Sequence, residues 1–336
     1  MNRYLPFQQN RLIENQNPKI ESPVSARGAS VIIPAYNYAQ YLEGAVRSAI
    51  GQTYQPIEVI IVDDGSTDAT PEVGQRLARE FPGVRYVRQQ NAGLSAARNT
   101  GIGLASHPFV TFLDCDDEFL PHMIGTLMRA FEAQPAGVGL VACRTIRIDS
   151  EGRPIGEKRL RPRGNRHYAS ADILMKTRFP CCVLALRTCF DSAGLFDPAL
   201  RSSEDRDMWI RIGRRHRIYY VDEPLVRIRR HNRNMSRNAA RMRAAMRRVR
   251  RKAIRARVVP LTHAGYWLRV FAVDHFQGGW MYWDEGSSIR AIVHAIVSIA
   301  LWPLPLNHRA LHEPPFFRFR AAARFLLEAP FRKKVR

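Results

Sequence analysis

Short apolar runs alternate with amphipathic stretches along the first third of the chain. Four of these runs are too short for helices and rich in β-branched and aromatic residues, which is typical of buried strands: 30–34, 57–62, 84–87 and 109–113. Apolar residues recur at helical spacing in the stretches between them. This alternation predicts parallel βαβ units, and therefore an α/β fold with a doubly wound, mostly parallel sheet flanked by helices.

The pattern changes after about residue 138. Alternation over 141–148 and the apolar run 181–186 predict two further strands, and a third is expected from 226 toward 236. A turn at 149–152, a mobile arginine-rich surface loop over 158–166 and a loop over 190–198 are expected between them. A helix is predicted from about Asp205 through Ile212.

Acidic residues gather directly after the strand 109–113. Asp114, Asp116, Asp117 and Glu118 fall within five positions, at the carboxyl end of that strand. Ligands bind at this edge of open α/β sheets, and clustered carboxylates repel one another unless a cation joins them. Oxygen ligands favour Mg²⁺ or Mn²⁺, usually held by one or two carboxylates together with substrate phosphates. A solvated acidic turn before the next helix is the alternative.

Two other loops follow strands of the same predicted sheet. Residues 34–37 and the pair Asp63 and Asp64 should therefore share one crevice with the acidic cluster. The chain contains neither a GxGxxG fingerprint nor a GxxxxGK[ST] loop. A nucleotidyltransferase should show a Gly-rich loop after the first strand, so that alternative is disfavoured.

Six segments in register carry a resemblance to a known family. They are SVIIPAYNYAQYL, VDDGSTD, NAGLSAARNTGI, FLDCDDEFLP, SSEDRDMWIRI and RIRRHNRNMS, between residues 30 and 236. In this order they resemble family 2 glycosyltransferases of the GT-A fold. The resemblance implies transfer of a sugar from a nucleotide-diphosphate sugar to an acceptor hydroxyl, with inversion, in the assembly of cell-surface glycans or glycolipids. The acceptor would be a glycan or a lipid-linked molecule.

The resemblance also implies roles for the nucleotide-binding residues. Pro34, Ala35 and Tyr36 are similar to the loop beside the nucleobase. Asp64 resembles the acid that contacts the base, a role suited to a carboxylate because it accepts N–H hydrogen bonds. Asp63 and Asp68 are expected as turn and capping acids of the next helix.

Two further residues are assigned to the donor through the same resemblance. Arg98 would reach a phosphate or steady the aspartates, and both possibilities stay open. Asp114 opens the segment Asp114-Cys115-Asp116, which resembles the DxD motif, and it would face the ribose.

The metal site is implied by the same resemblance. Asp116 resembles the ligand of Mg²⁺ or Mn²⁺, and Asp117 as the principal ligand is the open alternative. His231 occupies the place of a histidine that approaches the metal or the diphosphate. An ordinary packing role for His231 is equally open.

The acidic pair Glu204 and Asp205 resembles the catalytic base of the family, and we favour Asp205. An acid in the first turn of a helix also stabilises the helix dipole, which is the structural alternative. Glu204 as the base remains the second possibility.

Charge divides the chain into unequal parts. The net charge is +22, yet residues 201–336 hold 30 Lys and Arg against 10 Asp and Glu. We predict a polar arm over 1–28, a catalytic domain over 29–236 and a basic, partly amphipathic helical extension over 237–336. The arginine-rich stretch 241–257 is expected to form a helix that is solvated or bound to a polyanion rather than deeply packed.

No nucleic-acid-binding motif accompanies this basic run, so we expect an anionic membrane surface rather than nucleic acid as its partner. A soluble cap on the catalytic domain is the alternative. A non-catalytic polyanion-binding scaffold would also explain the basic charge, but it would not need Asp116, Asp205 and His231.

The location of the protein is predicted from three features. Residues 1–28 show no secretory segment, and the five cysteines lack a CxxC pair, which favours free buried thiols. The apolar stretch 291–306 is interrupted by His294 and Pro303 and is short for a membrane span. We therefore expect a cytoplasmic protein, peripheral on the inner face of the membrane.

Overall fold

The computed structural model describes residues 27–155, 164–176, 179, 182–231, 234, 238–306, 314 and 316–331. The predicted alternation of strands and helices is confirmed in the first third of the chain. Its elements are β1 (Ala29–Ala35), α1 (Ala39–Ile50), β2 (Ile57–Asp63), α2 (Thr70–Glu80), β3 (Val84–Arg88), α3 (Leu94–Leu104) and β4 (Phe109–Phe112). The predicted boundaries lie within one to a few residues of the observed ones.

One mixed sheet organises the molecule, in the order β3-β2-β1-β4-β8-β6-β9-β5. Strands β1 to β4 are mutually parallel, as expected for βαβ units. Strand β8 (Val183–Leu186) runs antiparallel between β4 and β6 (Val138–Ile148), whereas β6 and β9 (Arg217–Arg229) are parallel. The short strands β5 (Glu118–Phe119) and β7 (Arg166–Tyr168) add antiparallel pairs to β9. The predicted mostly parallel α/β fold is confirmed.

The second half of the sheet corrects two predictions. Strand β9 begins at Arg217, well before the predicted start at 226, and ends at Arg229. Pro224 obscured this strand because proline is unusual inside a strand, and here it pairs with Arg144 at a register shift. Helix α6 (Thr188–Ala193) occupies part of the predicted loop 190–198. Most of the predicted loop 158–166 lies outside the described residues.

The hydrophobic core has two parts because alternate side chains of each strand point to opposite faces. Ile32 of β1 belongs to one cluster, whereas its neighbours Val31 and Ile33 belong to the other. Helices on both faces cover these side chains, including α4 (Met123–Glu132). The four described cysteines, Cys115, Cys143, Cys182 and Cys189, are buried, as predicted, and Cys115, Cys143 and Cys189 are free thiols.

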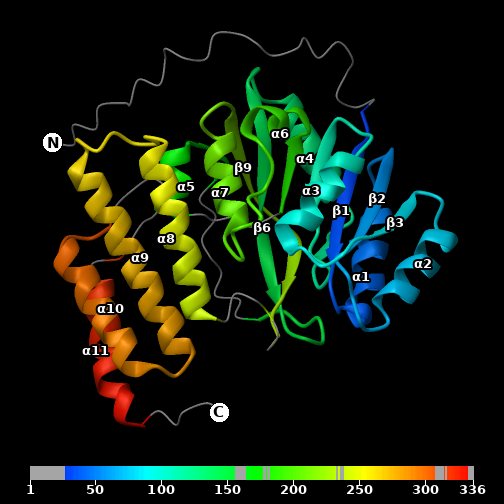
Figure 1. The fold of residues 1–336 in the computed structure, drawn as a ribbon. Helices are drawn as coiled ribbons and strands as arrows, with labels where there is room; N and C mark the ends of the chain where they lie inside the picture. Colours follow the sequence, from blue (N-terminus) through cyan, green and yellow to red (C-terminus); the bar gives the residue numbers. More distant parts are fainter. Residues whose placement is uncertain are drawn as a thin grey trace.

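Four helices follow the sheet, as Figure 1 shows at the left of the view. They are α8 (Ala239–Arg255), α9 (Ala264–Asp284), α10 (Ser288–Leu301) and α11 (Phe317–Glu328). Helices α5 (Ser170–Met175) and α7 (Glu204–Ile212) contact them from the sheet side. Within the described ranges no helix is long and apolar enough to cross a membrane.

The prediction that the stretch 241–257 stays solvated is wrong. Val249 and Ala253 of α8 belong to the same core cluster as Trp209 of α7. Arg243 and Arg250 are also buried, and both pair with Asp274 of α9. The local sequence suggested a solvated helix because this acidic partner lies on another helix.

Candidate active site

A cavity of about 670 Å³ opens at the carboxyl ends of β1, β2 and β4. The start of α7 and the first turn of α8 close it from the other side. Ten of the eleven predicted site residues line this cavity: Pro34, Ala35, Tyr36, Asp64, Arg98, Asp114, Asp116, Asp117, Glu204 and Asp205. The eleventh, His231, hydrogen-bonds to Asp116.

The loops after β1 and β2 are fastened to each other. Asn37 has the left-handed backbone conformation, with φ 57°, and its side-chain oxygen accepts the Thr67 N–H at 2.7 Å. Asp68 accepts the backbone N–H groups of Thr70 and Ala39, which agrees with its predicted capping role. Tyr36 is 46% exposed beside these fixed loops and lines the cavity.

Asp64 shapes the wall on the nucleotide side. One carboxylate oxygen accepts hydrogen bonds from the Gln89 side chain at 2.7 Å and from the Ala92 N–H at 2.9 Å. The other accepts the Gly93 N–H at 2.7 Å, and Gly93 takes a positive φ of 92° before α3. Asp64 therefore holds the loop before α3, and its contact with a nucleobase stays a prediction.

Arg98 links two of the acidic elements. Its guanidinium donates to Asp114 at 2.7 Å and to Glu204 at 2.6 Å, and only 1% of the residue is exposed. The ring of Phe196 lies 5.5 Å below the guanidinium carbon. Arg98 thus steadies the aspartates, one of its two predicted roles, and its contact with a phosphate stays a prediction.

Asp116 lies at the centre of a small polar cluster. Its Oδ2 is 2.9 Å from His231 Nε2 and accepts the Asn234 amide at 3.1 Å. The His231 ring packs against Tyr38 and Tyr41, with ring centres 5.7 and 5.5 Å away. These contacts hold the Asp116 carboxylate and the His231 imidazole next to each other.

The side chain of Asp117 points in a different direction from that of Asp116 and is more deeply buried. Its side chain is buried and accepts the Arg229 N–H at 2.9 Å. Burial raises the pKa of Asp117 well above its usual range, and the charges of Asp116 and Asp114 raise it further. Burial and Asp114 also raise the pKa of Asp116, while the hydrogen bond from His231 opposes this shift. A bound cation would relieve the repulsion among these carboxylates.

The residues present fit a metal ion that the donor helps to hold. Across the described ranges, no group of three or more His, Cys, Asp and Glu side chains could hold an ion by itself. Asp116 and His231 would supply two ligands, and diphosphate oxygens would complete the shell. The carboxylate and the diphosphate oxygens agree with the usual binding of Mg²⁺ by one or two carboxylates together with substrate phosphates.

The two acids at the start of α7 lie in different environments. Glu204 is 5% exposed and is engaged by Arg98. Asp205 lines the cavity, and among the described residues its side chain accepts a hydrogen bond only from the N–H of the next residue, Arg206, at 2.6 Å. Burial and the adjacent Glu204 charge raise the pKa of Asp205 to about 7, against the opposing effect of Arg98. A carboxylate with this pKa is suited to general base catalysis near neutral pH.

Several residues of the site were not predicted. Asn234 donates to Asp116 and also accepts the backbone N–H of His231 at 2.6 Å. It was missed although it lies within the motif RIRRHNRNMS, from which His231 was selected. Arg241 and Met242 of α8 also line the cavity. In the sequence these two residues were marked only by the basic stretch 241–257, which did not indicate that this helix would lie beside the cavity.

Comparison with known proteins identifies the family. Residues 30–193 match the family model described as glycosyl transferase family 2. This segment, just under half of the chain, is that of a family 2 glycosyl transferase. The family 2 segment contains Asp64, Asp114 and Asp116, whereas Glu204, Asp205 and His231 follow it.

Curated proteins similar to this chain are named as glycosyltransferases. It is 45% identical over 104 residues to the uncharacterized glycosyltransferase YibD of Escherichia coli, covering 31% of this chain and 30% of the relative. It is 32% identical over 216 residues to the uncharacterized glycosyltransferase EpsJ of Bacillus subtilis, covering 61% of each. The chain spans less than two thirds of the length of these relatives.

Two solved structures share the fold. The mannosyltransferase PcManGT of Pyrobaculum calidifontis, in complex with GDP-Man and Mn²⁺, has a TM-score of 0.56 and 20% identity, covering 94% of this chain and 90% of that chain. TarS of S. aureus, in complex with UDP-GlcNAc, has a TM-score of 0.53 and 17% identity, covering 82% and 89%. The chain therefore has the GT-A fold of these two structures.

Proposed function

We propose that this protein transfers a sugar from a nucleoside-diphosphate sugar to an acceptor hydroxyl of a glycan or a lipid-linked molecule. The observation that carries the proposal is the meeting of Asp64, Asp116 and Asp205 around one cavity, from three distant parts of the chain. The family assignment and the donors bound in the two structural relatives support it.

We assign a separate role to each group of residues along the wall of the cavity. Asp64, Tyr36 and the loop before α3 bind the nucleoside, while Asp114, held by Arg98, faces the ribose. Asp116 and His231 hold Mg²⁺ or Mn²⁺, which when bound offsets the charge of the departing diphosphate. Asp205 removes the proton of the acceptor hydroxyl, and direct displacement inverts the anomeric configuration.

A panel of donors tests this proposal. We expect the purified full chain, with Mn²⁺, to release nucleoside diphosphate from one class of donor among UDP-, GDP-, CDP- and dTDP-sugars. Slow hydrolysis by water replaces the unknown acceptor in this assay. The thermal unfolding temperature gives an independent measurement. We expect one nucleoside diphosphate to raise it only when Mn²⁺ is present, and this nucleotide identifies the same donor class. Failure of every donor in both measurements would contradict the proposal.

We also propose that the helices α10 and α11 rest on an anionic membrane surface. Ile289, Val293 and Ile296 recur at i, i+4 and i+7 on α10 and are 80%, 51% and 53% exposed. Phe319 and Leu327 of α11 are 44% and 73% exposed. Exposed apolar residues on one helix face mark an interaction surface.

Charge points to anionic lipid as the partner of this apolar surface. Arg290, Arg320 and Arg324 are exposed on the same two helices. An apolar face with basic neighbours suits the lipid interface, where each basic residue contributes roughly 1 kcal/mol and salt weakens the attraction. A lipid-linked acceptor would be consistent with this location.

Vesicle flotation tests the membrane proposal. We expect the full chain to float with vesicles that contain phosphatidylserine, to float less with phosphatidylcholine alone, and to be released by salt. The double variant Ile289→Asp, Val293→Asp should lose flotation, whereas the control Ile155→Asp, at a site 42% exposed outside these helices, should keep it. Equal flotation with both vesicles would exclude the anionic surface, and self-association of the chain without lipid would indicate a second copy as the partner.

A further inference from the structure

The loop 194–203 connects α6 to α7 and leads directly into Glu204 and Asp205. On its inner side, the Asn99 side chain pairs with both backbone groups of Phe196, each at 2.9 Å. The Ser95 hydroxyl lies 3.4 Å from the Leu200 carbonyl. Helix α3, which also carries Arg98, therefore holds this loop from the sheet side.

The outer side of the same loop is held by three basic residues of α8. Arg241 donates two hydrogen bonds to the Arg201 carbonyl, at 3.0 and 2.6 Å. Arg248 donates to the Ala199 carbonyl at 3.3 Å. Lys252 completes the series, and the spacing of seven and four residues places all three on one face of the helix.

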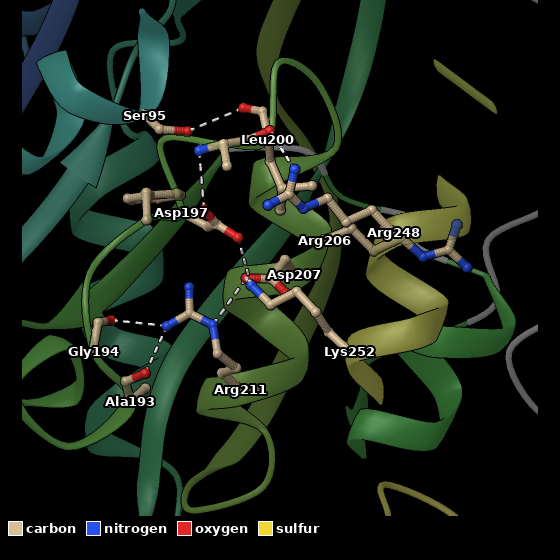
Figure 2. A network of polar contacts seen from close by, with 12 residues as sticks. Ser95, Ala193, Gly194, Asp197, Leu200, Arg206, Asp207, Arg211, Arg248 and Lys252 are labelled. Carbon is tan, nitrogen blue, oxygen red and sulfur yellow. Dashed lines mark hydrogen bonds and ion pairs between the residues drawn. The ribbon is translucent and has the colours of Figure 1, made fainter. Parts of the chain in front are cut away.

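Lys252 joins the loop to α7, as Figure 2 shows. Its ammonium lies 3.0 Å from Asp197 in the loop and 2.8 Å from Asp207 in α7. Asp207 also accepts Arg211 Nε at 2.9 Å, and the side chain of Asp207 is only 4% exposed. Because the Asp207 carboxylate is shielded from solvent, its attraction to Lys252 and Arg211 is only weakly screened, and the geometry of these contacts is well defined.

Arg211 closes the network at the beginning of the loop. Its guanidinium donates to the carbonyls of Ala193, Gly194 and Leu195, at 2.6, 3.0 and 2.9 Å. Figure 2 shows Arg211 on one side of Asp207 and Lys252 on the other. The first part of the loop, up to Asp197, is thus tied to α7 through the buried carboxylate of Asp207.

The inner surface of this loop forms part of the cavity. Residues 200–205 line it, together with Arg241 and Met242 of α8. Ser203, just before the acidic pair, has the left-handed conformation with φ 56°, which costs energy and persists only where the surroundings enforce it. The contacts with α8 and α3 supply that enforcement.

We propose that α8 positions the catalytic base Asp205 by holding the loop 194–203, with Lys252 as the principal positioning residue. This inference rests on the proposed function and extends it, because it makes the basic extension part of the catalytic machinery. Transfer requires the base to lie within hydrogen-bond reach of the acceptor oxygen, and small displacements of such groups are costly. The residues proposed to bind the donor, Asp64, Asp114 and Asp116, lie outside this loop, so we expect donor binding to change little when the loop is loosened.

The variant Lys252→Met tests the inference, since it keeps the aliphatic stem and removes only the charge. We expect turnover to fall by about 10- to 100-fold, while the affinity for UDP or GDP with Mn²⁺ changes by less than about twofold. Lys252→Arg should restore most of the turnover. Arg251→Met is the matched control, because Arg251 is exposed and has no hydrogen bond or ion pair to the described residues.

Hydrogen exchange measures the loop without relying on activity. In Lys252→Met, we expect faster exchange in the peptide that covers 195–205 and unchanged exchange in β1. Wild-type turnover in Lys252→Met, or an equal loss in Arg251→Met, would overturn the positioning role. If the wild-type chain turns over no donor, the proposed function fails, and unchanged exchange in Lys252→Met would then overturn the structural part separately.

Discussion

Replacing Asp205 by asparagine is expected to lower sugar transfer by about 10²- to 10⁴-fold, the usual contribution of a positioned general base. Asparagine keeps the shape of the side chain but cannot take the acceptor proton. Nucleoside-diphosphate affinity should stay near the wild-type value, because the donor is bound by other residues. Initial rates and isothermal calorimetry with the matching nucleoside diphosphate measure the two effects.

The pH dependence provides a second test of Asp205. Its pKa of about 7 means that the wild-type rate should rise with pH through this value, as the carboxylate becomes free to accept a proton. The folded pKa lies above the unfolded one, so the native state loses stability as pH rises from about 4 toward 7. Asp205→Asn should lose the inflection in rate and unfold at a higher temperature than the wild type at pH 8.

Glu204→Gln is the control for Asp205→Asn, and the structure indicates its expected outcome. Glu204 pairs with the buried Arg98, so its loss should mainly lower thermal stability, with Asp114 left as the partner of Arg98. Near-wild-type transfer in Asp205→Asn, combined with abolished transfer in a folded Glu204→Gln, would reverse the roles of the two acids.

Replacing Asp116 by alanine is expected to abolish the metal-dependent part of nucleoside-diphosphate binding. Asp116 follows a strand and contacts His231 and Asn234 rather than the hydrophobic core, so the fold should remain intact. A loss of about 1.4 kcal/mol corresponds to each tenfold decrease in affinity, which calorimetry with and without Mn²⁺ resolves. Unchanged affinity in Mn²⁺ would refute the assignment of Asp116.

Asp117→Asn decides between the two aspartates. The amide oxygen can still accept the Arg229 N–H, so this variant should preserve the local structure. We expect it to keep metal-dependent binding, because Asp117 is turned toward the backbone of β9. If Asp117→Asn loses that binding and Asp116→Ala keeps it, Asp117 is the principal ligand.

The sequence determined the elements that depend on local pattern. Short continuous apolar runs predicted β1 to β4, because strands such as β1 and β4 are buried on both faces, and apolar residues at helical spacing predicted the intervening helices. Six short motifs located Asp64, Asp116 and Asp205, and parallel connectivity predicted that loops from separate strands would meet. The motifs also located the pair Glu204 and Asp205, but they did not show that the two carboxylates lie in different environments.

Only the tertiary structure decided which charges pair across long separations. Lys252 meets Asp207 across 45 residues, and Arg243 meets Asp274 across 31, so neither pairing leaves a local periodic signal. These contacts bury a helix that its composition suggested was solvated. The distinct environments of Glu204 and Asp205 arise in the same way, since the Arg98 that pairs with Glu204 lies on a helix 106 residues earlier in the chain.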